Sequence, residues 1–178
     1  DGTYQIESML NNNYVLDVTS SSISNGANVQ LYESNNTNAQ GWKITHDENG
    51  YVTFTNVNSG KVLEVSTGKA SDSQNIVQNT SDGSRKQKWI VIKRNNGYEI
   101  VSALNKSYCI DLSGSSVRNS SNIQLYSSNG TNAQRWQINK FSSIAVAIDE
   151  IANENRNAIV DGTYQIESML NNNYVLDV

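Results

Sequence analysis

Residue types that carry out catalysis are scarce in this chain of 178 residues. A Ser-His-acid triad needs a histidine, and the single one, His46, stands in a polar segment typical of a solvated loop. Cys109 is the single cysteine, so no intramolecular disulfide can form. Its neighbours Tyr108 and Ile110 are typical of a strand and favour a buried thiol over a nucleophile. These residues give no support to nucleophilic catalysis.

The usual sequence patterns of metal and phosphate sites are also missing. The chain has no cluster of His and Cys and no Asp-x-Asn-x-Asn-Gly calcium loop. Residues 67–71, Thr-Gly-Lys-Ala-Ser, resemble part of a phosphate-binding loop, but Leu63 stands where the first glycine of that loop belongs. We therefore predict a turn at 67–71, no metal site and no cofactor.

Composition narrows the classes of partner. The net charge is −4, and no block of Lys or Arg is present, which argues against binding to nucleic acids or to anionic lipid. No run approaches the roughly 18 apolar residues of a membrane span, so we expect no membrane insertion. Hydrophobic residues make up 37% of the chain and include three Trp and nine Tyr, enough to fill a core.

An internal repeat of 47 residues organises most of the sequence. Trp42, Trp89 and Trp136 follow one another at this interval, and each ends a Gln-x-Trp motif. The repeats begin at Tyr4, Tyr51 and Tyr98. The same register aligns further positions without a gap: Asp17 with Glu64 and Asp111, Asn25 with Asp72 and Asn119, and Asn28 with Asn75 and Asn122.

Each repeat has the pattern of four short strands. In the first repeat they are predicted at residues 4–7, 14–18, 28–32 and 40–44, separated by polar turns that include residues 11–13 and 25–26. Twelve strands in three equivalent sets of four indicate an all-β fold, the β-trefoil, over residues 1–141. The three Trp should then converge on one core, and the Gln of each Gln-x-Trp should satisfy backbone groups of the adjoining loop.

The three Gln-x-Trp motifs, with Leu-Asp-Val on the second strand and Gln-Leu-Tyr on the third, resemble the ricin B-like (R-type) lectin family over residues 3–140. That resemblance implies a shallow sugar site in each repeat, built from a carboxylate, an aromatic ring and orienting amides. A carboxylate accepts hydrogen bonds from sugar hydroxyls, and the ring covers the C–H face. The implied site residues are Asp17, Gln30, Tyr32, Asn38 and Gln40 in the first repeat, and Asp111, Gln124, Tyr126, Asn132 and Gln134 in the third.

The second repeat departs from this pattern at the same positions. Glu64 replaces the Asp, Val77 the Gln, Asn79 the Tyr and Arg85 the Asn. Without a stacking ring or an orienting amide, we expect this site to be silent and the other two to be about equal. Asp17 and Asp111 lie in different repeats, so they cannot act as the paired carboxylates of a glycosidase.

The period ends after the third repeat. Ile144, Ile148 and Ile151 fall on one face at helical spacing, which predicts a linker helix within residues 142–160. Residues 161–178 then repeat residues 1–18 letter for letter. Two interpretations stay open: this segment begins the next copy in a tandem array, which we favour, or it exchanges with residues 1–18 of the same or another chain.

These observations predict a non-catalytic binding protein with no enzyme activity. The resemblance implies glycans of galactose type as its ligands, with xylan-type polymers as the alternative. The alternative is a structural or protein-binding trefoil with vestigial sugar sites, because one fold hosts unrelated functions. The absence of Pro and the abundance of Asn hint at a bacterial source, and a lectin function favours an extracellular or cell-surface location.

Overall fold

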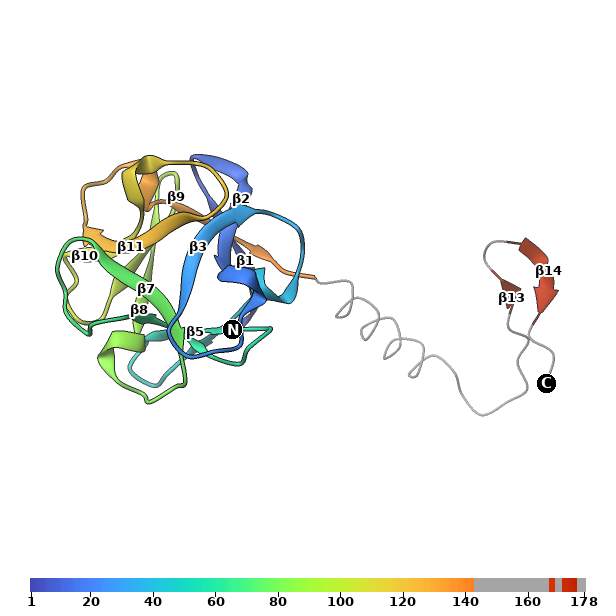
Figure 1. The fold of residues 1–178 in the computed structure, drawn as a ribbon, viewed down its shortest axis with the longest axis horizontal. Helices are drawn as coiled ribbons and strands as arrows, with labels where there is room; N and C mark the ends of the chain where they lie inside the picture. The colour runs from blue at the N-terminus through green and yellow to red at the C-terminus, as the bar shows by residue number, and fades with distance from the viewer. Residues whose placement is uncertain (143–166, 169–170, 176–178) are drawn as a thin grey trace. The chain divides into compact units, whose positions relative to one another are not determined.

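The computed structural model describes residues 1–142, 167–168 and 171–175. Residues 1–143 form one compact unit and residues 144–178 a second. The first unit is all β (Figure 1), as the strand pattern predicts. No helix among the described residues is long and apolar enough to cross a membrane. The predicted linker helix lies outside the described residues, except for Ser142.

Twelve strands of the first unit share one sheet. They are β1 (Gly2–Ser8), β2 (Asn11–Val18), β3 (Ala27–Glu33), β4 (Trp42–His46), β5 (Val52–Asn56), β6 (Val62–Val65), β7 (Gln74–Asn79), β8 (Trp89–Arg94), β9 (Gly97–Ser102), β10 (Tyr108–Leu112), β11 (Ser121–Ser127) and β12 (Trp136–Lys140). Short 3₁₀ turns connect several of them: η1 (Thr19–Ser21), η2 (Asn38–Gln40), η3 (Arg85–Gln87), η4 (Ser113–Ser115) and η5 (Asn132–Gln134).

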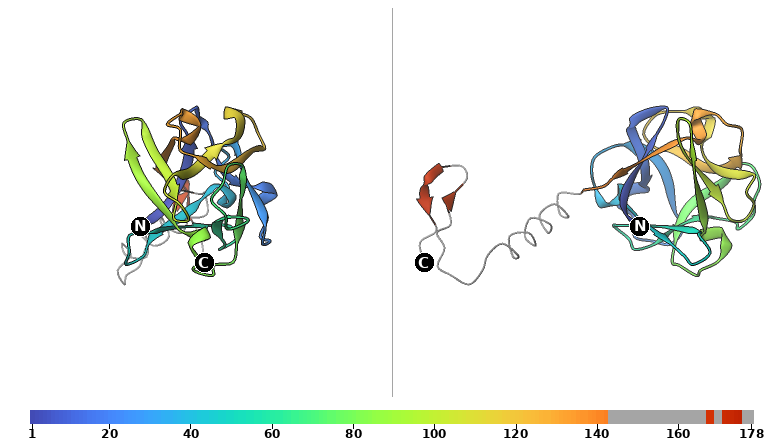
Figure 2. Two further views of the ribbon diagram at one scale, coloured as in Figure 1. Left: turned by 90° about the vertical axis from the view of Figure 1, so that its left-hand side faces the viewer. Right: turned by 180° about the vertical axis from the view of Figure 1, so that it is seen from behind.

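Six of these strands close into a barrel. Antiparallel pairs join β1 to β4, β4 to β5, β5 to β8, β8 to β9, β9 to β12 and β12 back to β1. The remaining strands form the hairpins β2–β3, β6–β7 and β10–β11, and β3, β7 and β11 also pair with one another. This is the predicted β-trefoil, and its rounded body is visible from each side (Figure 2).

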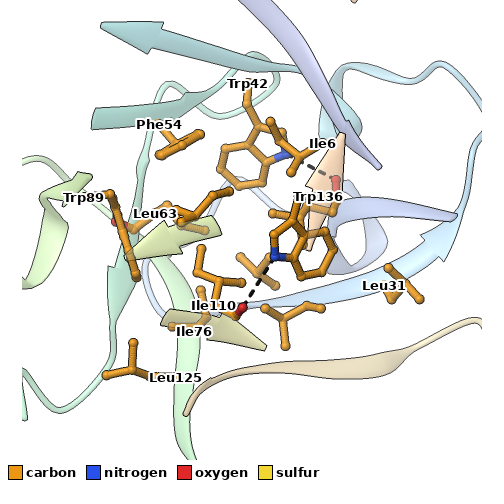
Figure 3. Close-up of a cluster of buried hydrophobic side chains, with 14 of the residues drawn as sticks. Ile6, Leu31, Trp42, Phe54, Leu63, Ile76, Trp89, Ile110, Leu125 and Trp136 are labelled. Carbon is orange, nitrogen blue, oxygen red and sulfur yellow. Dashed lines mark hydrogen bonds between the residues drawn. The ribbon is translucent and has the colours of Figure 1, made fainter. Parts of the chain in front are cut away.

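The three tryptophans fill the core as predicted. Trp42, Trp89 and Trp136 are fully buried, and their indoles reach toward a shared group of aliphatic side chains (Figure 3). Each indole N–H donates to a backbone carbonyl of its own repeat, at 3.1, 3.2 and 3.4 Å. Because the partner oxygens come from the strand that carries the acidic residue, the core also fixes the position of that strand.

Two local predictions are wrong. Residues 11–13 open β2 instead of forming a turn, and the chain reverses at residues 9–10. The side chain of Asn11 accepts a hydrogen bond from Asn13 N at 3.0 Å, so local side-chain bonding accompanies the extended backbone. Gln40 lies in η2, and β4 begins only at Trp42.

A ring of three asparagines joins the hairpins. Asn28 donates to Asn122 at 3.1 Å, Asn122 to Asn75 at 2.9 Å, and Asn75 to Asn28 at 2.8 Å, in each case from Nδ2 to Oδ1. These residues occupy equivalent positions in the three repeats, so the repeat aligned by sequence is closed by side chains as well as by strands.

The second unit contains a short hairpin of β13 (Glu167–Ser168) and β14 (Asn171–Val175). Glu167 pairs with Val175 and Ser168 with Asn171, with a register shift between the two pairs. The hairpin β1–β2 has the same register at Glu7–Val15 and Ser8–Asn11. The duplicated sequence therefore adopts the same local pairing.

Candidate functional site

The acid and amide of the first repeat face each other across a hairpin. Asp17 on β2 pairs with Gln30 on β3, and Gln30 Nε2 donates to Asp17 Oδ1 at 2.9 Å. Asp17 and Gln30 are 13 residues apart in the sequence and are neighbours in the sheet. Both side chains are 5% exposed. Tyr32 lies two residues beyond Gln30 on the same face of β3, because side chains alternate along a strand.

The third repeat reproduces this arrangement. Asp111 on β10 pairs with Gln124 on β11, whose Nε2 donates to Asp111 Oδ1 at 2.8 Å. Tyr126 follows on the same face of β11. Burial raises the pKa of Asp17 and of Asp111, and the neighbouring glutamine amides act in the opposite direction. The two buried carboxyl groups, one in each repeat, thus have the same kind of local environment.

A pocket opens over each of these pairs. The first has a volume of about 360 Å³ and is lined by Asp17, Thr19, Ser20, Ser21, Gln30, Tyr32, Asn35, Thr37 and Ser120. The second measures about 280 Å³ and is lined by Asp111, Leu112, Gly114, Ser115, Gln124, Tyr126, Asn129, Thr131 and Ala133. In each of the two repeats, the acid, the amide and the Tyr implied for the site therefore line the same pocket.

The structure places the two Gln-x-Trp glutamines behind the pockets. Gln40 and Gln134 are fully buried and line neither pocket. Gln40 accepts from Asn35 N at 2.8 Å and donates to the Glu33 carbonyl at 2.9 Å. Gln134 makes the equivalent bonds to Asn129 and Ser127. Both glutamines thus brace the adjoining loop, and their implied contact with a ligand stays a prediction.

Asn38 and Asn132 also lie outside the pocket linings. The Asn132 Oδ1 accepts from Asn96 Nδ2 at 2.6 Å, whereas the Asn38 Oδ1 is buried with no partner among the described residues. Both residues begin a 3₁₀ turn, η2 in the first repeat and η5 in the third.

Asn35 and Asn129 stand in the pockets instead, followed by Thr37 and Thr131. The sequence held a signal for them, because the second repeat has Asp82 and Ser84 at these positions and so departs here too. The loop residues Ser20 and Ser21 had no such signal. Their φ angles of +52° and +51° place them in the left-handed region, where sequence patterns identify glycine more readily than serine.

The acidic residue of the second repeat is closed off by its neighbours. Glu64 is 1% exposed, and its Oε1 accepts from Asn79 Nδ2 at 2.6 Å while Oε2 accepts from Gln87 Nε2 at 2.6 Å. Lys86 Nζ lies 3.2 Å from Glu64 Oε1, and this hydrogen bond raises the pKa of Lys86. Both carboxylate oxygens are thus occupied by side chains of the same repeat.

Residues considered for catalysis lie apart from these pockets. His46 ends β4 instead of lying in a loop, and its Nδ1 is 2.9 Å from Asp1 Oδ1 on the surface. Cys109 is fully buried, as predicted, and burial raises the pKa of its thiol. The described residues contain no group of three or more His, Cys, Asp or Glu side chains that could hold a metal ion.

Comparison with known protein families identifies the fold's relatives. The family model described as "Ricin-type beta-trefoil lectin domain-like" matches residues 1–79, 38–126 and 85–178. The chain belongs to this ricin-type lectin-like family. A search of curated protein sequences found no match.

Solved structures with the same fold include both whole trefoils and modules of larger proteins. The designed threefold-symmetric protein ThreeFoil is 28% identical, with a TM-score of 0.75, and the match covers 79% of this chain and 99% of that one. The Rhizoctonia solani agglutinin is 25% identical, with a TM-score of 0.72 and coverages of 78% and 94%. The exo-β-1,3-galactanase 1,3Gal43A from Clostridium thermocellum is 28% identical, with a TM-score of 0.74.

In the galactanase the match covers 78% of this chain but only 30% of the enzyme. A ricin-type trefoil can thus be one part of a larger glycan-degrading protein. The lectin-like family and the lectin fold support carbohydrate binding, without catalysis, as the general function of this chain.

Proposed function

We propose that this protein binds glycans through two sites, one at Asp17 in the first repeat and one at Asp111 in the third. The observation that carries the proposal is the acid–amide–Tyr arrangement, which recurs in two pockets and is replaced in the second repeat by the enclosed Glu64. A chance cluster of polar side chains would not recur at equivalent positions with hydrogen bonds of 2.9 and 2.8 Å.

The chemistry of each pocket suits a sugar. The carboxylate Oδ1 is held by the glutamine amide, which leaves acceptor capacity for sugar hydroxyls. The Tyr ring offers an apolar face to sugar C–H groups, and nearby Asn and Thr side chains can both donate and accept. The galactanase among the relatives supports galactose-type ligands, and xylan-type polymers are the second ligand class in the proposal.

The sites are open and small, so each should bind weakly, with Kd values on the order of a millimolar. Binding at two sites on one chain raises avidity toward multivalent glycans by about 10² to 10⁴. We place such a protein outside the cell or on its surface, where multivalent glycans occur, and we place its source among bacteria.

A glycan array combined with calorimetric titration of lactose and xylotriose tests the proposal. The variants are Asp17→Ala, Asp111→Ala and the double variant, with Glu64→Ala as the matched control in the second repeat. We expect each single variant to retain one site, the double variant to bind nothing, and Glu64→Ala to keep both sites while losing stability. Absence of glycan binding by the unmodified chain would favour the structural or protein-binding alternative.

A further inference from the structure

One wall of the first pocket comes from a different repeat. Ser120 belongs to the turn before β11 in the third repeat, yet it lines the pocket together with Asp17, Gln30 and Tyr32. For the pocket of the third repeat, the equivalent residue is Ser73 of the second repeat, which does not line that pocket. The two pockets are therefore not equivalent in the part that their neighbouring repeat supplies.

Backbone and side-chain bonds hold the Ser120 turn against β3. Ser120 N donates to the Leu31 carbonyl at 3.0 Å, between Gln30 and Tyr32 of the pocket. The Asn119 Oδ1 accepts from Glu33 N at 2.8 Å. Because both bonds join the turn to the strand that carries the amide and the Tyr, the position of Ser120 relative to them is defined by the fold.

The backbone at this position does not itself call for serine. Ser120 has a φ of +65°, and the equivalent residue of the first repeat is Gly26, with a φ of +76°. A side chain in the left-handed region costs about 1 kcal/mol relative to glycine. Ser120 is exposed, and its hydroxyl makes no hydrogen bond to any described residue. Ser73, at the same position of the second repeat, has a φ of +63°, so a positive φ alone does not distinguish Ser120, whereas its place in the lining of the first pocket does.

The pockets also differ in the hydroxyl groups that they offer. The first contains five hydroxyl-bearing Ser or Thr residues, namely Thr19, Ser20, Ser21, Thr37 and Ser120. The pocket of the third repeat contains two, Ser115 and Thr131, and its lining also includes Leu112, Gly114 and Ala133. A polyhydroxylated ligand can therefore form more hydrogen bonds in the first pocket.

We propose that Ser120 completes the first sugar site across the boundary between repeats, by hydrogen bonding to a hydroxyl of the bound sugar, and makes this site the tighter of the two. The inference rests on the proposed glycan binding and deepens it. It replaces the expectation from sequence that the two sites are equal with an order of affinity.

The test isolates each site in turn. Asp111→Ala leaves only the first site, and Ser120→Ala and Ser120→Gly are added to it separately, with Ser73→Ala as the matched control at the equivalent turn. Titration with lactose and xylotriose measures Kd, and thermal unfolding checks the fold. Glycine is well accommodated at positive φ, so Ser120→Gly should unfold at no lower temperature than its parent.

We expect both Ser120 variants to weaken the first site about fivefold, the effect of one lost hydrogen bond, and Ser73→Ala to leave it unchanged. In an Asp17→Ala background, Ser120→Ala should not change binding at the third site. An unchanged Kd for Ser120→Ala would overturn the inference, as would a loss seen only with Ser120→Gly, because backbone freedom would then be responsible. Failure of the proposed function is recognised separately, since the parent chain and Asp111→Ala would then bind neither sugar.

Discussion

At the scale of single residues, the two buried aspartates determine how binding depends on pH. Burial raises the pKa of Asp17 and of Asp111 above the usual value of about 3.9. Protonation removes the charge and turns one carboxylate oxygen into a hydroxyl donor, which leaves less acceptor capacity for sugar hydroxyls. We expect sugar affinity to decline as the pH falls through these raised pKa values, and titrations between neutral and acidic pH would measure the decline. Constant affinity down to the usual Asp value would contradict this.

The same raised pKa values affect stability in the opposite direction. The folded protein binds these protons more tightly than the unfolded chain does, so the contribution of both groups to stability is full at low pH. It is lost as the pH rises through the folded-state pKa values. In an Asp17→Asn, Asp111→Asn variant this part of the pH dependence should disappear, which denaturant unfolding at several pH values would detect. If the stability of the variant changed with pH as steeply as that of its parent, other titratable groups would dominate the pH dependence.

At the scale of the elements, the asparagine ring joins the three hairpins. Asn75→Ala removes one hydrogen bond that Asn75 donates and one that it accepts. Since a neutral hydrogen bond on a partly exposed surface contributes modestly, we expect the free energy of unfolding to fall by about 1 kcal/mol. Urea unfolding measures this change, with the exposed Asn12→Ala as control. Equal losses in both variants would mean that the ring does not hold the hairpins together.

The strand pattern predicted the elements well and their ends less well. Alternating apolar residues, together with the register shared by the three repeats, predicted twelve strands, because burial of one face imposes that pattern. Residues 11–13 were misplaced because Asn is typical of turns, whereas here the exposed start of β2 accommodates it. Gln40 was assigned to a strand because it adjoins the Trp, but its amide braces a loop.

At the scale of the whole molecule, the copied segment 161–178 can belong to either of two arrangements, a tandem array or an exchange of strands. The family match over residues 85–178 includes this segment, as both arrangements require. We favour the tandem array, in which the segment begins another trefoil, because strand exchange needs a vacated position that residues 1–18 already fill as β1 and β2. We therefore expect a chain ending at Ser142 to unfold at the same temperature as the full chain, with the same oligomeric state and the same sugar affinity. Light scattering and titration provide the measurements. A change in oligomeric state on truncation would favour strand exchange instead.

The sequence by itself determined the features that repeat. A 47-residue period with three Gln-x-Trp motifs implied three equivalent sets of strands and a shared Trp core, because each repeat buries the same positions. The departures of the second repeat were visible in the same way, although the part that Lys86 plays in enclosing Glu64 was not.

Only the tertiary structure decided which side chains complete each pocket. Asn35, in the loop before η2, lines the first site, whereas Asn38, the first residue of η2, does not. Ser120 reaches that site because β3 and β11 pair across the boundary between repeats. Contacts between distant parts of a chain follow from how the strands close into a barrel, and a comparison of repeats within the sequence carries no record of them.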